Sequence, residues 1–253
     1  MGKKGGPKHL KRLPAPVFWP IHRKEFKFVL KPKPGPHGKD RSFPLLLILR
    51  EMLGLVKNRK EAKRLLSERH VKVDGVIRLK DNYPVGLMDV VEIPIIKKAF
   101  RILPIRRKRL GLHVIGEGEK GFKLSKIMNK TNVSGGNLQL NLHDGRNILL
   151  KIVDSKNMVD DVYKTHDVLK IGIPSSEIVS HLTFSTGVLA IVEDGKNVGR
   201  LGEIMAIETG GSSRPSIVTL KDIEDDQFKT IIDYVFPVGK DELWISLPEE
   251  VKE

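Results

Sequence analysis

The charges of this chain are divided unevenly along its length, and the division limits how its 253 residues can fold and associate. Residues 1–113 carry 29 Lys and Arg against 9 Asp and Glu, a net charge of +20, whereas residues 114–253 carry 16 against 22, a net charge of −6. So many uncompensated positive charges repel one another, and a polyanion would relieve that cost. Nucleic acid is the first candidate, because neutralising its phosphates releases condensed counterions.

The composition limits the remaining choices. With 40% hydrophobic and 30% charged residues, two or three small domains are expected rather than one large one. The chain has no cysteine, and its eight histidines lack the spacing of a zinc ligand pair, so we expect no disulfide, metal or cofactor. The longest apolar run, Leu45 to Leu49, is too short to span a membrane, and no signal-peptide pattern follows the basic N-terminus. The sequence predicts a cytosolic protein.

Residues 1–42 have the composition of an extended basic arm. They hold seven of the fifteen prolines and 12 Lys and Arg against two acids. Because proline fixes φ and removes hydrogen-bond donors, this stretch cannot build a core of its own and should become ordered against a partner. Its apolar residues could anchor it to the body: Val17, Phe18, Trp19, Phe26, Phe28, Val29 and Leu30. The alternative is a solvated tail, and we expect removal of residues 1–42 to leave a folded remnant with no new core exposed.

Residues 43–94 predict two helices followed by a hairpin. Pro44 suits the first turn of a helix whose apolar face runs from Leu45 to Leu53, and Gly54 suits its C-terminal cap. Asn58 opens a second helix, with Glu61 as its capping partner. On a helical wheel this helix has one cationic face, with Arg59, Lys60, Lys63 and Arg64, and one packing face, with Ala62, Leu65, Leu66 and Arg69. Asp74-Gly75 then joins Val71–Val73 to Val76–Leu79 as a hairpin, and Asp89–Ile93 predicts a further strand.

This order of elements, with Val-x-Val-Asp-Gly in the hairpin and Tyr83-Pro84 before the last strand, resembles the RNA-binding domain named after bacterial small-subunit ribosomal protein four. In that family the second helix and the hairpin form the RNA surface. The resemblance therefore implies an RNA-binding role for Arg59, Lys60, Lys63, Arg64, Arg69, Lys72, Arg78 and Lys80. The alternative is that these charges form only the solvated face of an amphipathic helix.

Beyond residue 95 the sequence predicts mostly strands. Phe100–Ile105 and Leu110–Ile115 flank four adjacent cations, which would be costly at a hairpin tip unless phosphates approach: Arg106, Arg107, Lys108 and Arg109. Further strands are expected at 137–142, 148–153 and 168–171, with a turn at Asp144-Gly145. A second β-module is expected to begin near Phe184.

That module is similar to the KOW element, a short strand-loop-strand unit of small SH3-like barrels in ribosomal proteins and elongation factors. The stretch Gly187–Ile204 carries the pattern, and its glycines permit backbone geometry closed to other residues. The matching loop positions are Gly195, Lys196, Asn197, Gly199 and Arg200. The element binds RNA in some relatives and protein in others, so both remain open.

Several short motifs extend the resemblance along nearly the whole chain. Lys8-His-Leu-Lys-Arg12, Gly35-Pro-His37, His143-Asp-Gly-Arg146 and Trp244-Ile-Ser-Leu-Pro248 occur in the order typical of the small ribosomal subunit protein four family of the eukaryotic and archaeal type. The chain stops at Glu253, where eukaryotic members continue into a basic tail, so the short form resembles archaeal members. The resemblance implies a structural ribosomal protein whose partners are small-subunit rRNA and neighbouring ribosomal proteins.

The expected fold class is α+β, mostly β. The resemblance divides the chain into an extended basic N-terminal arm (1–42), a two-helix plus hairpin RNA-binding domain (43–104), a central β-domain (105–180), a KOW SH3-like barrel (181–240) and a C-terminal tail (241–253). Outside the RNA-binding domain, the predicted RNA contacts are Lys3, Lys4, Lys8, Lys11, Arg12, Lys31, Lys33, Lys39, Arg41, Arg106, Arg107, Lys108, Arg109, Lys196 and Arg200.

Motifs that suggest enzyme chemistry are isolated. Gly116–Gly121 matches a dinucleotide-binding pattern, but Glu117 and Glu119 would repel a pyrophosphate. Lys123-Leu-Ser-Lys126 is similar to a synthetase loop, and His143-Asp144 is not a triad without a nucleophile. We therefore expect no catalytic residue and no small-molecule substrate. Two rival hypotheses remain: an RNA-modifying enzyme that uses the same binding module, and a transcription or translation factor that holds proteins through the KOW element.

Overall fold

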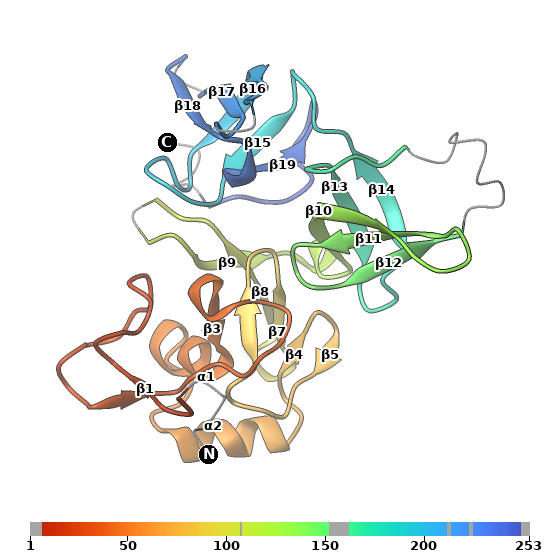
Figure 1. The fold of residues 1–253 in the computed structure, drawn as a ribbon. Helices are drawn as coiled ribbons and strands as arrows, with labels where there is room; N and C mark the ends of the chain where they lie inside the picture. The colour runs from red at the N-terminus through yellow and green to blue at the C-terminus, as the bar shows by residue number, and fades with distance from the viewer. Residues whose placement is uncertain (1–6, 107, 152–161, 212–213, 223–224, 249–253) are drawn as a thin grey trace, which may run out of the picture.

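The computed structural model describes residues 7–106, 108–151, 162–211, 214–222 and 225–248. These residues form a mostly β protein with three five-stranded antiparallel sheets, two short strand pairs and two α-helices. In Figure 1 the N-terminal arm and the helices lie at one end of the molecule, the C-terminal sheet at the other, and the central sheet to one side. The mostly β expectation is confirmed.

The arm packs against the helices as a small hairpin. Strand β1 (Leu10–Lys11) pairs antiparallel with β2 (Phe28–Val29). The side chain of Trp19 is 3% exposed, and its Nε1 donates a hydrogen bond to the Ser42 carbonyl at 2.9 Å. Leu10 and Ala15 also belong to the main apolar core, so removal of residues 1–42 would expose core surface, and that part of the expectation was wrong. Val17 and Phe26 stay exposed.

The first helix is shorter than its apolar pattern predicts. After β3 (Ser42–Pro44), α1 covers only Leu45–Leu47 and continues as the π-helical turn η2 (Ile48–Met52), whose closing bond runs from the Leu53 N–H to the Ile48 carbonyl at 3.0 Å. Residues 45–49 are all buried, so this helical segment is surrounded by protein on every side. Gly54 has φ +63°, the left-handed geometry expected of the residue that ends the helix.

The second helix and the hairpin agree with their predictions in position. Helix α2 covers Arg59–Ser67, β4 Lys72–Val73 and β5 Val76–Ile77, and the turn residues Asp74 and Gly75 have φ values of 49° and 71°. This left-handed pair is the geometry of a primed hairpin turn. β6 (Pro84–Gly86) then pairs with β3, and β7 (Val90–Ile93) pairs with β4.

The first five-stranded sheet extends beyond the expected domain boundary. Its order is β5-β4-β7-β8-β9, with β8 at Lys98–Leu103 and β9 at Gly111–Ile115. Because Leu103 pairs with Gly111, the boundary expected between residues 104 and 105 falls inside this hairpin.

The central sheet has the order β12-β11-β10-β13-β14 and encloses its own apolar cluster. Its strands are β10 (Phe122–Asn132), β11 (Leu138–Leu142), β12 (Asn147–Leu150), β13 (Val168–Gly172) and β14 (Ile178–Leu182). The strands at β11, β12 and β13 and the turn at Gly145, with φ +73°, were predicted. β10 and β14 were not, and the domain boundary expected after residue 180 falls inside β14. Residues 152 and 153, the end of the predicted second strand, lie outside the described residues.

The C-terminal sheet has the order β18-β17-β16-β15-β19. Its strands are β15 (Leu189–Val192), β16 (Leu201–Glu208), β17 (Ile217–Lys221), β18 (Gln227–Ile231) and β19 (Val235–Gly239). Short 3-10 turns occupy Lys39–Arg41, Pro94–Ile96, Glu117–Glu119 and Ile232–Tyr234. Core residues of the arm, the helices and this sheet belong to one apolar cluster, so these parts are packed together.

Candidate nucleic-acid interface

Helix α2 presents its cations as an ordered row. The Asn58 side chain caps the helix by accepting hydrogen bonds from the N–H groups of Lys60 and Glu61, at 3.0 and 3.1 Å, and the Glu61 carboxylate accepts from the Lys57 N–H at 2.7 Å. The helix buries Ala62 and Leu66. Its four predicted RNA-binding residues are exposed: Arg59, Lys60, Lys63 and Arg64. Amphipathic packing therefore fixes these charges toward solvent.

Two of the four arginines and lysines also have a carboxylate partner. Arg59 is bonded to Asp81, and the guanidinium of Arg64 bonds Glu68 one turn along at 2.9 Å. The Arg64 side chain is 81% exposed, so this pair contributes little stability. The row therefore remains available to an incoming phosphate.

Arg69 does not lie on the packing face of α2, and that prediction was wrong. The helix ends at Ser67, and Arg69 takes a left-handed φ of 62° that turns its side chain outward. In the hairpin, Lys72 is half-buried, Lys80 is exposed, and the Arg78 guanidinium lies 4.3 Å from the centre of the Tyr83 ring. These four predicted residues continue the cationic surface beyond α2.

The arm adds a charge to this surface at one clear point. The Lys33 N–H donates to the Asn82 carbonyl at 2.8 Å, which places the arm beside the end of the hairpin. The neighbouring cation Lys80 lowers the pKa of Lys33. Two neighbouring lysines are an arrangement that a bridging phosphate would stabilise.

The other predicted cations of the arm differ in exposure. Lys8, Lys11 and Arg41 are exposed, Lys31 donates to the Pro7 carbonyl at 2.6 Å, and Lys39 lies 3.5 Å from Asp40. Arg12 is only 5% exposed and bonds the His22 carbonyl and the Glu25 carboxylate. It therefore ties the arm together, contrary to its predicted place on the RNA surface. Lys3 and Lys4 lie outside the described residues.

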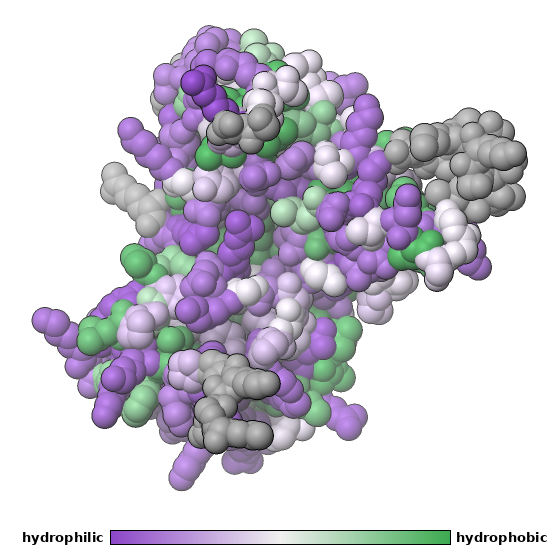
Figure 2. Space-filling view, viewed as in Figure 1, coloured by the Kyte–Doolittle hydropathy of each residue, from purple (hydrophilic) through white to green (hydrophobic). Residues whose placement is uncertain are grey.

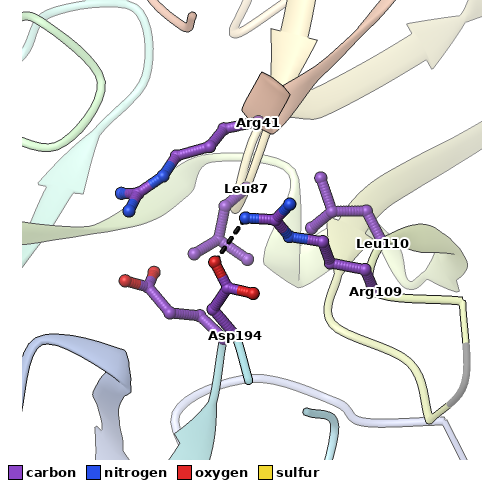
Figure 3. A pocket seen from close by; sticks show the side chains of 6 residues that line it. Arg41, Leu87, Arg109, Leu110 and Asp194 are labelled. Carbon is purple, nitrogen blue, oxygen red and sulfur yellow. Dashed lines mark hydrogen bonds and ion pairs between the residues drawn. The ribbon is translucent and has the colours of Figure 1, made fainter. Parts of the chain in front are cut away.

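The cations of the β8–β9 hairpin tip partly neutralise themselves within the chain. Arg109 forms an ion pair with Asp194, and the Arg106 guanidinium lies 3.9 Å from the Asp222 carboxylate. Figure 3 shows Arg41 and Arg109 over the same small pocket as Asp194. The acidic C-terminal part therefore supplies carboxylates to these two arginines, so phosphate is not the only counter-charge within their reach. Lys108 is exposed, and Arg107 lies outside the described residues.

The two predicted cations of the KOW loop differ in exposure and pairing. Lys196 is exposed, whereas Arg200 bonds Asp222 and Asp226 and lies 4.2 Å from the centre of the Phe228 ring. Gly195 and Gly199 have φ values of 88° and 79°, the backbone geometry that glycine permits. The loop geometry thus agrees with its glycine pattern. Arg200 is bonded within the C-terminal part of the chain.

Sequence reasoning missed a buried ionic cluster between the RNA-binding domain and the central sheet. The Lys123 ammonium, 0% exposed, contacts carboxylates of Asp74 at 3.0 Å, Asp144 at 2.9 Å and Asp89. Arg146 bonds Asp74 at 2.7 Å, and His37 of the arm bonds Asp89 at 3.0 Å. We call these six residues, Lys123, Asp74, Asp89, Asp144, Arg146 and His37, the Lys123 cluster. It joins three segments that lie far apart in the sequence.

The electrostatics of the Lys123 cluster favour the charged forms of its central members. Burial alone would raise the pKa of Asp89, but His37 and Lys123 outweigh it and hold that pKa below its usual range. Burial opposes the charge on Lys123, yet the surrounding carboxylates raise its pKa. Asp74 differs, because burial and the nearby Asp89 raise its pKa. The Lys123 cluster therefore links the arm, the RNA-binding domain and the central sheet through buried ion pairs.

The Lys123–Lys126 motif is thus a structural strand and not a catalytic loop. Lys126, also fully buried, donates to the Asp233 and Val235 carbonyls at 2.6 and 3.1 Å and joins β10 to the C-terminal sheet. His143 accepts from the Lys126 N–H at 3.2 Å, and burial lowers the pKa of His143 to about 3. His143, Lys123 and Lys126 therefore serve the packing of the fold. Across the described ranges, no helix has the length and apolar character that a membrane span requires.

Comparisons with known proteins first define a class of RNA-binding protein. Residues 44–91 match the model of the S4 domain, which agrees with the helix and hairpin surface described above. Residues 4–40 match the RS4NT (NUC023) domain, and residues 96–178 match the ribosomal family S4e.

Relatives over the whole length define the family. The chain is 51% identical to small ribosomal subunit protein eS4 of Staphylothermus marinus over 98% of this chain and 99% of that protein. It is 47% identical to the same protein of Methanocaldococcus jannaschii, over 98% of this chain and all of that protein. The crystal structure of 30S ribosomal protein S4e from Thermoplasma acidophilum superposes with a TM-score of 0.66 at 30% identity, covering 81% of this chain and 98% of that one. The chain belongs to the eS4 family of small ribosomal subunit proteins, which is a family of structural proteins and not of enzymes.

Proposed function

We propose that this protein is a structural constituent of the small ribosomal subunit, in the cytoplasm, and that it binds small-subunit rRNA through the face formed by α2, the β4–β5 hairpin and the adjoining arm. One observation carries the proposal: apolar packing of Ala62 and Leu66 directs a row of four cations to solvent. The S4 domain match over residues 44–91 covers the same elements.

The proposed RNA surface consists of exposed and half-exposed cations. Phosphate neutralisation favours such side chains whichever base lies nearby, and duplex RNA offers mainly shape, phosphates and 2′-hydroxyls. On this face the set is Lys8, Lys11, Lys31, Lys33, Lys39, Arg41, Arg59, Lys60, Lys63, Arg64, Arg69, Lys72, Arg78 and Lys80. Two exposed lysines outside this face, Lys108 and Lys196, are proposed as separate RNA contacts. Arg12 is left out because it is buried. Arg106, Arg109 and Arg200 are left out because each pairs with a carboxylate of the acidic C-terminal part.

The C-terminal sheet is proposed to be a KOW-type SH3-like barrel that meets neighbouring ribosomal proteins. Two features support this: the left-handed glycines Gly195 and Gly199 in the β15–β16 loop, and the net charge of −6 on residues 114–253, which disfavours an RNA phosphate surface. The proposed division of the chain is an arm, an RNA-binding domain that includes β9, a central domain that ends with β14, the barrel and a short tail.

Salt dependence of rRNA binding tests the proposal. If about 6 to 10 phosphates are neutralised, affinity should fall about a thousandfold or more between 50 and 200 mM salt. Lys63→Ala and Arg64→Ala should each weaken binding and reduce the slope of log K against log salt by about 1.

The matched control is Lys229→Ala, an exposed lysine of β18 that pairs with Glu208 at 2.8 Å in the acidic part. It should leave affinity and slope unchanged. A salt dependence that is nearly flat, or equal in the Lys63 and Lys229 variants, would contradict the proposed RNA surface. The rival hypothesis of an RNA-modifying enzyme has no support from the family.

A further inference from the structure

A solvent-open groove lies between the arm hairpin and the helical domain. It encloses about 880 Å³, within the range of about 300–1,000 Å³ typical of ligand sites. Lys8, His9, Phe26, Lys27 and Phe28 line it from the arm, and Leu46, Leu47, Arg50 and Arg59 from the helices. We propose that this groove, which we call the arm groove, holds a single-stranded RNA segment, with an unpaired base against Phe26 or Phe28 and its phosphates on the surrounding cations.

The charge of the arm groove selects an anionic occupant. Six cations line the groove: Lys8, Arg12, Lys27, Lys31, Arg50 and Arg59. Among the described residues, no carboxylate lines it. Arg12, Arg50 and Arg59 each bond a carboxylate that lies outside the lining, Glu25, Glu51 and Asp81 respectively. Three lysines remain to neutralise phosphates directly, so a polyanion is favoured over an acidic or apolar small molecule.

The aromatic side chains select the form of that polyanion. Phe26 is 62% and Phe28 49% exposed, and the Arg12 guanidinium lies 4.9 Å from the centre of the Phe26 ring. Lys27 lies 5.5 Å from the centre of the Phe28 ring, and His9 lies 5.7 Å from it between centroids. Figure 2 shows hydrophobic residues among hydrophilic ones at this end of the molecule. Aromatic rings with cations beside them are the stacking platforms of single-strand binding sites.

Duplex RNA cannot use these rings, because its bases expose only their edges in the grooves. An unpaired base can place its π-face on Phe26 or Phe28 while its phosphates reach the lysines. The apolar floor of Leu46 and Leu47 belongs to the protein core and fixes the depth of the groove. The site therefore fits a loop, bulge or linker of rRNA, and it adjoins the cationic row of α2, with which it shares Arg59.

The inference rests on the proposed function, since both assign RNA as the ligand, but a fluorescence experiment separates them. The probe is a single-stranded oligonucleotide of rRNA sequence with 2-aminopurine at one position, compared with the same sequence closed into a hairpin. The proteins are the full chain, the double variant Phe26→Leu with Phe28→Leu, and Leu13→Ala as a control, because Leu13 is 70% exposed on the arm outside the groove.

We expect the unmodified chain to quench 2-aminopurine in the single strand, and the double variant to lose the quenching and bind it roughly 5- to 100-fold more weakly, the range expected for one stacked base. Phe28→Trp should restore both when introduced into Phe26→Leu. Leu13→Ala should behave as the unmodified chain, and hairpin binding should stay unchanged in every variant.

Equal single-strand affinity and equal quenching in the double variant would overturn the inference while leaving the proposed function intact, provided that hairpin binding keeps its salt dependence. Failure of the unmodified chain to bind either RNA would overturn both. Unchanged RNA binding, together with capture of an acidic ribosomal protein that the double variant loses, would assign the groove to protein and also overturn it.

Discussion

Replacing Lys123 with methionine should be among the most destabilising single changes in this chain. The variant Lys123→Met keeps the length of the side chain but removes the ammonium that Asp74, Asp89 and Asp144 share. All three carboxylates are at most 7% exposed in their side chains, so water cannot replace the lost partner. Arg146 and His37 remain as partial compensation.

The magnitude follows from removing one partner of a buried ion pair, which costs about 3–5 kcal/mol. For chains of about 150–250 residues, 1 kcal/mol shifts the melting temperature by about 2–4 °C. The melting temperature of Lys123→Met should therefore fall by roughly 6–20 °C. The assay is thermal unfolding by calorimetry, supported by urea unfolding followed by circular dichroism.

The control is Lys98→Met in β8, where the lysine is exposed and the change should stay within about 0.5 kcal/mol. Adding Asp89→Asn and Asp144→Asn to Lys123→Met should recover part of the loss, because it removes the uncompensated buried charge. A Lys123→Met protein within about 1 kcal/mol of the unmodified chain would refute the reasoning.

Three further predictions concern other contacts of the fold. Gly199→Ala should lower the free energy of unfolding in urea more than Gly136→Ala. Both glycines have positive φ, but a Cβ at Gly199 would lie 2.5 Å from the Arg106 backbone nitrogen, whereas nothing lies within 4 Å at Gly136. Equal losses of stability would contradict this close approach. Trp19→Ala should lose about 3–5 kcal/mol of stability, and an unchanged melting temperature would show that the arm is not part of the core. His143 has a folded-state pKa of about 3 against about 6.5 when unfolded, so the unfolded chain binds more protons between these values and stability falls as pH drops through that window. His143→Gln should reduce this slope by up to about 1.4 kcal/mol per pH unit, and an unaltered slope would exclude the burial effect.

Local sequence signals predicted the RNA-binding domain well. The Asn58 cap, the Asp74-Gly75 turn and the apolar positions Ala62 and Leu66 act within a few residues, and the observed elements follow them. The end of α2 was less predictable, because Arg69 leaves the helix through a left-handed residue that a wheel cannot reveal.

Contacts between distant segments were beyond the sequence. Lys123 and Lys126 occur in a strand with a polar sequence. Only the tertiary fold places carboxylates that are 34 and 49 residues distant in the sequence next to Lys123. The arm was predicted as an extended basic segment, yet the burial of Trp19 depends on where Ser42 and the helices lie. The neutralisation of Arg109 by Asp194, 85 residues further on, depends likewise on the packing of the C-terminal sheet.

The most direct test of the RNA surface is lysine acetylation of the protein, free and assembled into small subunits, read residue by residue by mass spectrometry. Lys33, Lys60 and Lys63 should react in the free protein and become protected on assembly, while Lys229 of the acidic part changes less. Equal reactivity of Lys60 and Lys63 in the free and assembled states would contradict the central claim that rRNA neutralises this face.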